Sequence, residues 1–298
     1  TGRYLGILRN TIGPGHNWIV AELNGSFFKE TGVIAGQSGS PMFVKLNGKS
    51  CKIGTVSYAD SFVKNPIAYL TPIEEVLDSE HAVGSASQTM PAKFSRSQLL
   101  KGIQDVLERD GMKKIFPIDN ISIGQQAIGE NATATRIEAG SVLGVQLAWG
   151  DFDYTGSGTV SHIEGDKIYM FGHPFLQLGP VEYRLVPAKV LTVQKSEWAS
   201  YIVAAPLEGA KTAGVIYQDR EAGIYGLLGK EPKNAIPISI NLTTSNGTKK
   251  NFKFYTISDS YFGPTLAAIG AYYTVGSWSR AFGNITLFVS GKIKVNDG

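Results

Sequence analysis

Short β-prone runs separated by turn residues dominate this chain of 298 residues. Gly occurs 35 times and Pro 13 times, and both types gather between the runs. Asn47-Gly48 separates two such runs and is typical of a hairpin, because the left-handed backbone of a tight turn suits both residues. This pattern predicts a mostly β fold with many turns. The N-terminal runs are Tyr4–Leu8, Trp18–Leu23, Met42–Leu46, Ile53–Ser57 and Ala68–Leu70, and those beyond Pro117 are Ser141–Trp149, Gly158–His162, Lys167–Phe171, Val186–Val193, Ala213–Tyr217 and Ile236–Leu242.

A few segments have helical signals instead. Thr71 followed by Pro72, Ile73 and two glutamates predicts a helix start, with Thr71 as the cap and the acids near the positive end of the helix dipole. Apolar residues at helical spacing predict an amphipathic helix over Ser97–Arg109. A further helix is expected over Thr265–Phe282, followed by a strand at Ile285–Val289.

Composition excludes several classes of function. The 28 basic residues exceed the 25 acidic ones only slightly, whereas nucleic-acid binding needs concentrated basic surface. An apolar fraction of 43% excludes a largely disordered chain. No run approaches the roughly 18 apolar residues that span a bilayer. We therefore expect no nucleic-acid partner and no membrane span in this chain.

Cofactor and metal motifs are missing from the sequence. Cys51 is the single cysteine, so neither an intrachain disulfide nor a cysteine-based metal site can form. The four histidines lack the spacing of a metal motif, and the Gly-rich stretches lack the Lys-Ser/Thr ending of a nucleotide loop. We expect neither a cofactor nor a metal.

One segment has the residues that acyl transfer requires. In Gly36-Gln37-Ser38-Gly39-Ser40-Pro41, a serine lies between glycines just before a β-prone run. Such a turn lets the backbone approach a scissile carbonyl, with Ser38 as nucleophile and the N–H groups of Gly36 and Ser38 as an oxyanion hole. The alternative is an ordinary Gly/Ser turn.

The surroundings of this turn resemble the nucleophile half of the SpoIVB-type serine peptidases, peptidase family S55. The resemblance covers the stretch from Thr31 to Pro41, then Ile53-Gly54-Thr55-Val56 and Pro72-Ile73-Glu74-Glu75. A second motif joins Gly158-Thr159-Val160 to Phe171-Gly172-His173-Pro174-Phe175, and Gly223-Ile224-Tyr225-Gly226 also matches. In the family such a Gly-His carries the catalytic histidine, which makes His173 the matching general base; otherwise His173 is a turn histidine.

This sequence departs from the family at three points. Gln37 stands where the family has Met, and the serine half precedes the histidine half, so the arrangement resembles a circular permutation. The position of the family's aspartate falls at or beside Asn24, which has no carboxylate. Asp219 is the preferred replacement, because it lies in the same predicted barrel as His173; its alternative role is a salt bridge with Arg220 or a turn cap. The acids kept in reserve are Asp151, Asp153, Asp166 and Glu182.

The resemblance implies two chymotrypsin-like β-barrels, circularly permuted, with a few helices. Its expected parts are a serine-bearing half (1–84), a linker with the amphipathic helix (85–140), a histidine-bearing barrel with return strands (141–257) and a C-terminal helix and strand (258–298). It implies a serine endopeptidase of the bacterial envelope, or secreted, that acts on protein or peptide substrates, self-cleavage included. The competing hypothesis is an inactive peptidase-like scaffold that binds a protein partner in the envelope, motivated by Asn24 and Gln37.

Overall fold

A computed structural model of the chain describes residues 1–61, 63–81, 121–123 and 136–278, together with the single positions 286, 288 and 290. Among the described residues, strands account for 53% and helices for 12%, which confirms the mostly β prediction. The chain divides into two compact units. Unit 1 comprises Thr1–Thr89, Ile118–Gln146 and Thr155–Pro232, and unit 2 comprises Met90–Pro117, Leu147–Tyr154 and Lys233–Gly298.

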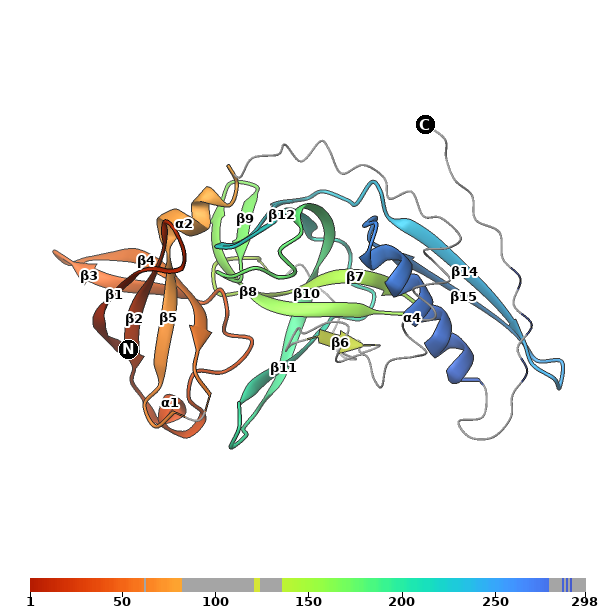
Figure 1. The fold of residues 1–298 in the computed structure, drawn as a ribbon, viewed down its shortest axis with the longest axis horizontal. Helices are drawn as coiled ribbons and strands as arrows, with labels where there is room; N and C mark the ends of the chain where they lie inside the picture. The colour runs from red at the N-terminus through yellow and green to blue at the C-terminus, as the bar shows by residue number, and fades with distance from the viewer. Residues whose placement is uncertain are drawn as a thin grey trace. The chain divides into compact units, whose positions relative to one another are not determined.

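The N-terminal part of unit 1 is a five-stranded antiparallel sheet (Figure 1). The turn between its last two strands places Asn47 and Gly48 at φ values of 50° and 77°, so the predicted hairpin is confirmed. One face of the sheet buries the apolar side chains Ala21, Leu23, Val56, Ala68 and Leu70. In spatial order the strands are β1 (Gly2–Gly13), β2 (His16–Leu23), β5 (Ile67–Pro72), β4 (Lys49–Ala59) and β3 (Pro41–Leu46).

Two short helices flank this sheet. Helix α1 (Ser26–Thr31) follows β2 and precedes the Ser38 turn. Helix α2 (Ile73–Asp78) follows β5 directly, with Glu74 and Glu75 in its first turn. The predicted helix is present, but its cap position is Pro72, and Thr71 is the penultimate residue of β5. Thr71 is therefore not the helix cap, because its hydroxyl has another partner, described below.

The histidine half of unit 1 is a closed six-strand β-barrel. Pairing of β10 (Gly179–Gln194) with β7 (Val142–Gly150), from Arg184 opposite Gln146 to Pro187 opposite Leu143, closes the ring. Its core includes Val160, Ile168 and Leu185. Outside the ring, β11 (Tyr201–Pro206) pairs with the second half of β10, and β6 (Ile121–Ile123) pairs with β8. Around the barrel the strands are β7 (Val142–Gly150), β8 (Tyr154–Glu164), β9 (Lys167–Met170), β13 (Gly223–Leu228), β12 (Gly214–Arg220) and β10 (Gly179–Gln194).

Unit 2 joins a long hairpin to a helix. Strands β14 (Ile236–Thr243) and β15 (Lys249–Thr256) pair with each other, and β15 pairs with the end of β7. Helix α4 (Phe262–Gly276) confirms the helix expected in this region. A side chain at Gly270 of α4 would collide with the Phe254 ring, 2.5 Å from an added Cβ, so this contact requires glycine.

Some predicted elements lie outside the described residues. These are the 85–140 linker with its amphipathic helix, except for β6 and positions 136–140, and the strand at Ile285–Val289, except for positions 286 and 288. Within the part of the chain that the structure describes, no helix is long and apolar enough to cross a membrane.

Candidate functional site

The turn that carries Ser38 is attached to the barrel hairpin at its start. Ala35 forms a parallel bridge with Tyr201 of β11: its N–H donates to the Ser200 carbonyl (3.0 Å) and its carbonyl accepts the N–H of Ile202 (2.9 Å). Gly36 then adopts a left-handed φ of 96°, and an added Cβ would lie 2.9 Å from the Ile202 Cβ. The glycine therefore allows the chain to turn sharply against β11 immediately before Ser38.

The second half of the turn packs on the barrel itself. The Ser38 carbonyl accepts the N–H of Thr159 at 3.1 Å, and the Gly39 N–H donates to the Val56 carbonyl at 2.7 Å. Gly39 has a φ of 94°, and an added Cβ would lie 2.0 Å from the Thr159 carbonyl oxygen and 2.8 Å from the Phe171 nitrogen. The backbone at Gly39 thus packs against β8 and against the start of the His173 turn, at a distance that only glycine permits.

The amide hydrogens of this turn differ in their partners. Those of Gln37, Gly39 and Ser40 donate to backbone carbonyls of the protein. The Ser38 amide has no acceptor among the described residues, and its hydroxyl also makes no hydrogen bond there. An unpaired N–H next to a serine hydroxyl is the arrangement that an oxyanion hole uses.

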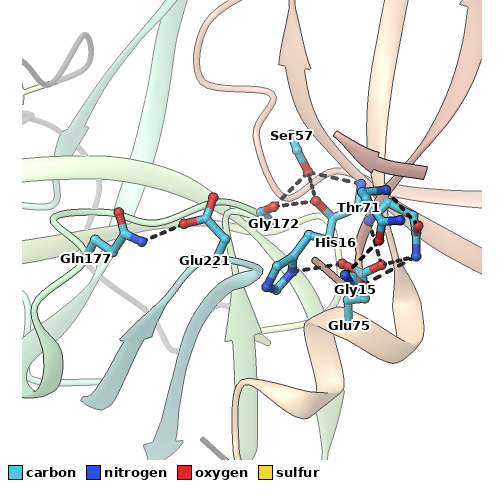
Figure 2. Close-up of polar contacts among 10 residues, drawn as sticks. Gly15, His16, Ser57, Thr71, Glu75, Gly172, Gln177 and Glu221 are labelled. Atoms are coloured by element: carbon cyan, nitrogen blue, oxygen red, sulfur yellow. Dashed lines mark hydrogen bonds and ion pairs between the residues drawn. The ribbon is translucent and has the colours of Figure 1, made fainter. Parts of the chain in front are cut away.

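The turn that carries His173 has a strained backbone. Phe171 and Gly172 have φ values of 71° and 70°. A bulky residue such as Phe in the left-handed region costs on the order of 1–3 kcal/mol and persists only where its surroundings hold it. Hydroxyls hold this turn: the Gly172 carbonyl accepts hydrogen bonds from Thr71 (2.6 Å) and Ser57 (2.8 Å), as Figure 2 shows.

The His173 imidazole has a defined tautomer. Its Nδ1 lies 2.7 Å from the Pro174 carbonyl oxygen. A carbonyl can only accept, so Nδ1 carries the hydrogen and Nε2 keeps its lone pair. The ring packs between aromatic neighbours, with centroids 5.6 Å from Tyr58 and 5.5 Å from Phe171. This is the tautomer in which Nε2 can accept a proton.

Burial lowers the pKa of His173 below its ordinary value of 6.5, while the Pro174 carbonyl and the charge of Asp219 act in the opposite direction. The imidazole is therefore neutral at pH 7 and able to act as a base.

Asp219 anchors the turn after His173 through backbone groups. Its side chain is fully buried, and its carboxylate accepts the N–H groups of Phe175 (2.8 Å) and Leu176 (2.7 Å) and the hydroxyl of Tyr183 (3.1 Å). Burial raises the pKa of Asp219, and these hydrogen bonds lower it. The partner of the His173 Nδ1 is the Pro174 carbonyl, so Asp219 acts on the imidazole only through its charge and through the turn.

A second contact ties the same turn to the β12–β13 connection. The Gln177 side-chain amide donates to Glu221 at 2.6 Å (Figure 2).

Burial and the nearby charge of Glu221 raise the pKa of Tyr58 to about 12. The phenol that lies against His173 therefore stays protonated at neutral pH.

The other acid candidates do not contact the imidazole. Within the described residues, the ring interacts with Pro174, Tyr58, Phe171 and the charge of Asp219. Asn24 is exposed, and its backbone N–H donates to the Thr1 carbonyl. Of the reserve acids, Asp166 and Glu182 belong to unit 1 and are not among these contacts, and Asp151 and Asp153 belong to unit 2.

The Ser38 and His173 turns meet on common residues. Gly39 contacts Val56, Thr159 and the Phe171 nitrogen, and an added Cβ on Gly172 would lie 2.5 Å from Thr55 and 3.4 Å from the Val56 carbonyl. The described residues include no hydrogen bond between the Ser38 hydroxyl and the imidazole. Catalytic hydrogen bonds are often long without substrate, and they tighten when it binds.

Sequence reasoning missed three participants. The sequence signals predict a helix cap at Thr71, a strand residue at Ser57 and no role for Pro174 beyond its place in a motif. The adjacency of His173 and Pro174 was the one signal in the sequence for the carbonyl contact.

Among the residues described, no group of three or more His, Cys, Asp or Glu side chains is placed to hold a metal ion.

Comparisons of the chain with protein-family models, curated proteins and solved structures found no match.

Proposed function

We propose that the protein is a serine endopeptidase in which Ser38 is the nucleophile and His173 the general base. The observation that carries the proposal is that the Ser38 turn and the His173 turn pack on common residues. In the first turn, glycines flank a serine whose amide is unpaired. In the second, the backbone is strained and the imidazole keeps its Nε2 lone pair. Residues held in strained backbone conformations, such as Phe171 at positive φ, cluster at active sites, ligand clamps and switch regions. The resemblance to the SpoIVB-type peptidases points to the same two residues.

In the proposed reaction, the Ser38 Oγ attacks the peptide carbonyl carbon while its proton passes to His173 Nε2. The Ser38 amide stabilises the oxyanion, and one such donor is worth about 3 kcal/mol. The imidazolium returns the proton to the leaving amine, which breaks the peptide bond and leaves an ester on Ser38. Water, deprotonated by His173, then hydrolyses that ester.

The Pro174 carbonyl takes the orienting role that a carboxylate has in a Ser-His-Asp triad. It fixes the tautomer, but as a neutral dipole it stabilises the imidazolium less than a carboxylate would. We therefore propose a Ser-His dyad with a carbonyl-oriented base, with Asp219 supplying only a more distant negative charge. By the family resemblance, the proposed setting is the bacterial envelope and the proposed substrate a protein.

A fluorophosphonate probe tests this function directly. The probe should modify wild-type protein at Ser38, as identified by peptide mass spectrometry, and Ser38→Ala should abolish both the modification and cleavage of unfolded casein. Ser40→Ala is the matched control, because this serine lies in the same turn and should leave labelling unchanged. Folded wild-type protein that never reacts with the probe would contradict the proposal.

The pH dependence of labelling follows from the burial of His173. Because the folded-state pKa lies below 6.5, the imidazole stays neutral down to a lower pH than a free histidine does. The labelling rate should therefore stay constant from pH 8 to 7 and fall with a midpoint below 6.5. The conformational stability should also decrease as pH falls below 6.5 towards that midpoint, since the unfolded chain binds the proton more readily. A midpoint above 7 would show that the base is not a buried histidine.

The inactive scaffold remains the second candidate, favoured by the lack of a Ser38–His173 hydrogen bond in the described residues and of a carboxylate on the imidazole. A scaffold predicts a folded protein that does not react with the probe at any pH. The labelling experiment therefore separates the two functions.

A further inference from the structure

We infer that Ser57 and Thr71 are positioning residues that set the placement of His173, an inference that rests on the proposed peptidase function. Both side chains are buried, with 5% and 2% of their surface exposed. Their hydroxyls lie 2.7 Å apart and both reach the Gly172 carbonyl, at 2.8 Å from Ser57 and 2.6 Å from Thr71 (Figure 2). We call this pair the hydroxyl clamp.

The clamp acts on the peptide group that leads into the histidine. The Gly172 carbonyl belongs to the same planar unit as the His173 nitrogen, so fixing that oxygen fixes the direction in which the chain enters His173. The Gly172 oxygen has two lone pairs and can accept both hydroxyls; because each hydroxyl has a single hydrogen, the 2.7 Å contact between them is a hydrogen bond only when one donates to the other instead of to Gly172. Ser57 also accepts the backbone N–H of Thr71 at 3.2 Å, which orients its own hydrogen towards Gly172 or the Thr55 carbonyl.

Neighbouring residues of β4 hold the two catalytic turns. The Val56 carbonyl accepts the Gly39 N–H at 2.7 Å, in the Ser38 turn, and the next residue, Ser57, binds Gly172 in the His173 turn. This short piece of β4 therefore contributes to the spacing between nucleophile and base. Phe171 and Gly172 are both left-handed, so their turn needs such an external restraint.

Two pairs of variants test the clamp. Thr71→Val removes a clamp hydroxyl, and Thr71→Ser restores it; Ser57→Ala removes the other. Ser79→Ala is the control, because Ser79 is also a buried serine whose hydroxyl donates to a backbone carbonyl, that of Val76 at 2.7 Å, but it lies at the end of α2.

Two measurements apply to each variant. Nitrogen-15 NMR reports the tautomer and titration of His173, assigned by comparison with His173→Gln. The rate of fluorophosphonate labelling, per folded molecule, reports the alignment of Ser38 with its base. Replacing a residue that merely stabilises the fold would change neither the His173 spectrum nor the labelling rate, whereas replacing a positioning residue changes both.

We expect Ser57→Ala/Thr71→Val to label about 100-fold more slowly, the loss typical of a small misplacement. Its His173 spectrum should shift towards mixed tautomers and titrate closer to 6.5. Thr71→Ser and Ser79→Ala should keep the wild-type spectrum and rate. If the double variant does not fold, Thr71→Val alone decides the question, with the same changes expected at smaller size.

Folded Thr71→Val and Ser57→Ala with the wild-type spectrum and rate would overturn the inference. The proposed function fails in a different way, when wild-type protein does not react with the probe. In that case the NMR comparison of the same variants still decides whether the clamp places the imidazole.

Discussion

Replacing His173 with glutamine is expected to slow fluorophosphonate labelling of Ser38, and any casein cleavage, on the order of 10⁵-fold. Loss of the base in a serine peptidase site costs this much because the serine hydroxyl is a weak nucleophile with its proton in place. Glutamine keeps a polar side chain of similar length, so the turn between Phe171 and Phe175 should still form. The experiment is a comparison of second-order labelling rates at pH 8 and pH 6.

His162→Gln is the matched control for this prediction. His162 is likewise half-buried in unit 1, with a pKa lowered by burial and by the charge of Lys52, but its ring contacts Lys52 and Tyr169 rather than the Ser38 turn. This variant should label at the wild-type rate. Equal losses of labelling rate in the two variants would indicate a general effect on folding. A His173→Gln variant that labels at the wild-type rate would exclude His173 as the base.

Asp219→Asn is expected to lower the free energy of unfolding by about 3–5 kcal/mol, measured by denaturant titration. The buried carboxylate accepts two backbone N–H groups and a phenol hydroxyl, and hydrogen bonds to a charged group are worth roughly 1.5–3 kcal/mol each. The side-chain amide of asparagine has only one oxygen to accept these hydrogen bonds, and its NH₂ group would face one of the donors that the carboxylate now binds. The exposed Asp151 accepts the backbone N–H of Lys253 at 2.7 Å, so Asp151→Asn is a control with a much smaller expected loss.

The same variant distinguishes two roles for Asp219. In a triad whose aspartate bonds the imidazole, replacement by Asn lowers the rate about 10⁴-fold while the geometry stays intact. Here the Pro174 carbonyl holds Nδ1, so the labelling rate of folded Asp219→Asn should fall far less, with the main loss in stability. A stable variant with a 10⁴-fold slower rate would instead identify Asp219 as the direct partner of the ring.

Local signals in the sequence predicted much of the fold. Asn47-Gly48 predicted its hairpin because left-handed backbone is a property of those residues themselves. The glycines around Ser38 predicted a tight turn for the same reason, and the structure explains both by close backbone contacts. The strand runs and the helix now bounded at Phe262–Gly276 followed from periodicity.

Long-range hydrogen bonds were beyond prediction from the sequence. Thr71 has every local feature of a helix cap, yet its hydroxyl binds Gly172, which is 101 residues away along the chain. Asp219 was expected on the imidazole, yet its oxygens bind the backbone of Phe175 and Leu176.

Where the chain turns, where it extends and which serine lies between glycines can be read from the sequence alone, because backbone preference is a property of each residue and its immediate neighbours. Which group orients His173, and which hydroxyls hold its turn, depends on the folded chain. A hydrogen bond depends on where two atoms lie in space, and a backbone carbonyl, such as that of Pro174 or Gly172, is present at every residue and so leaves no mark in the sequence.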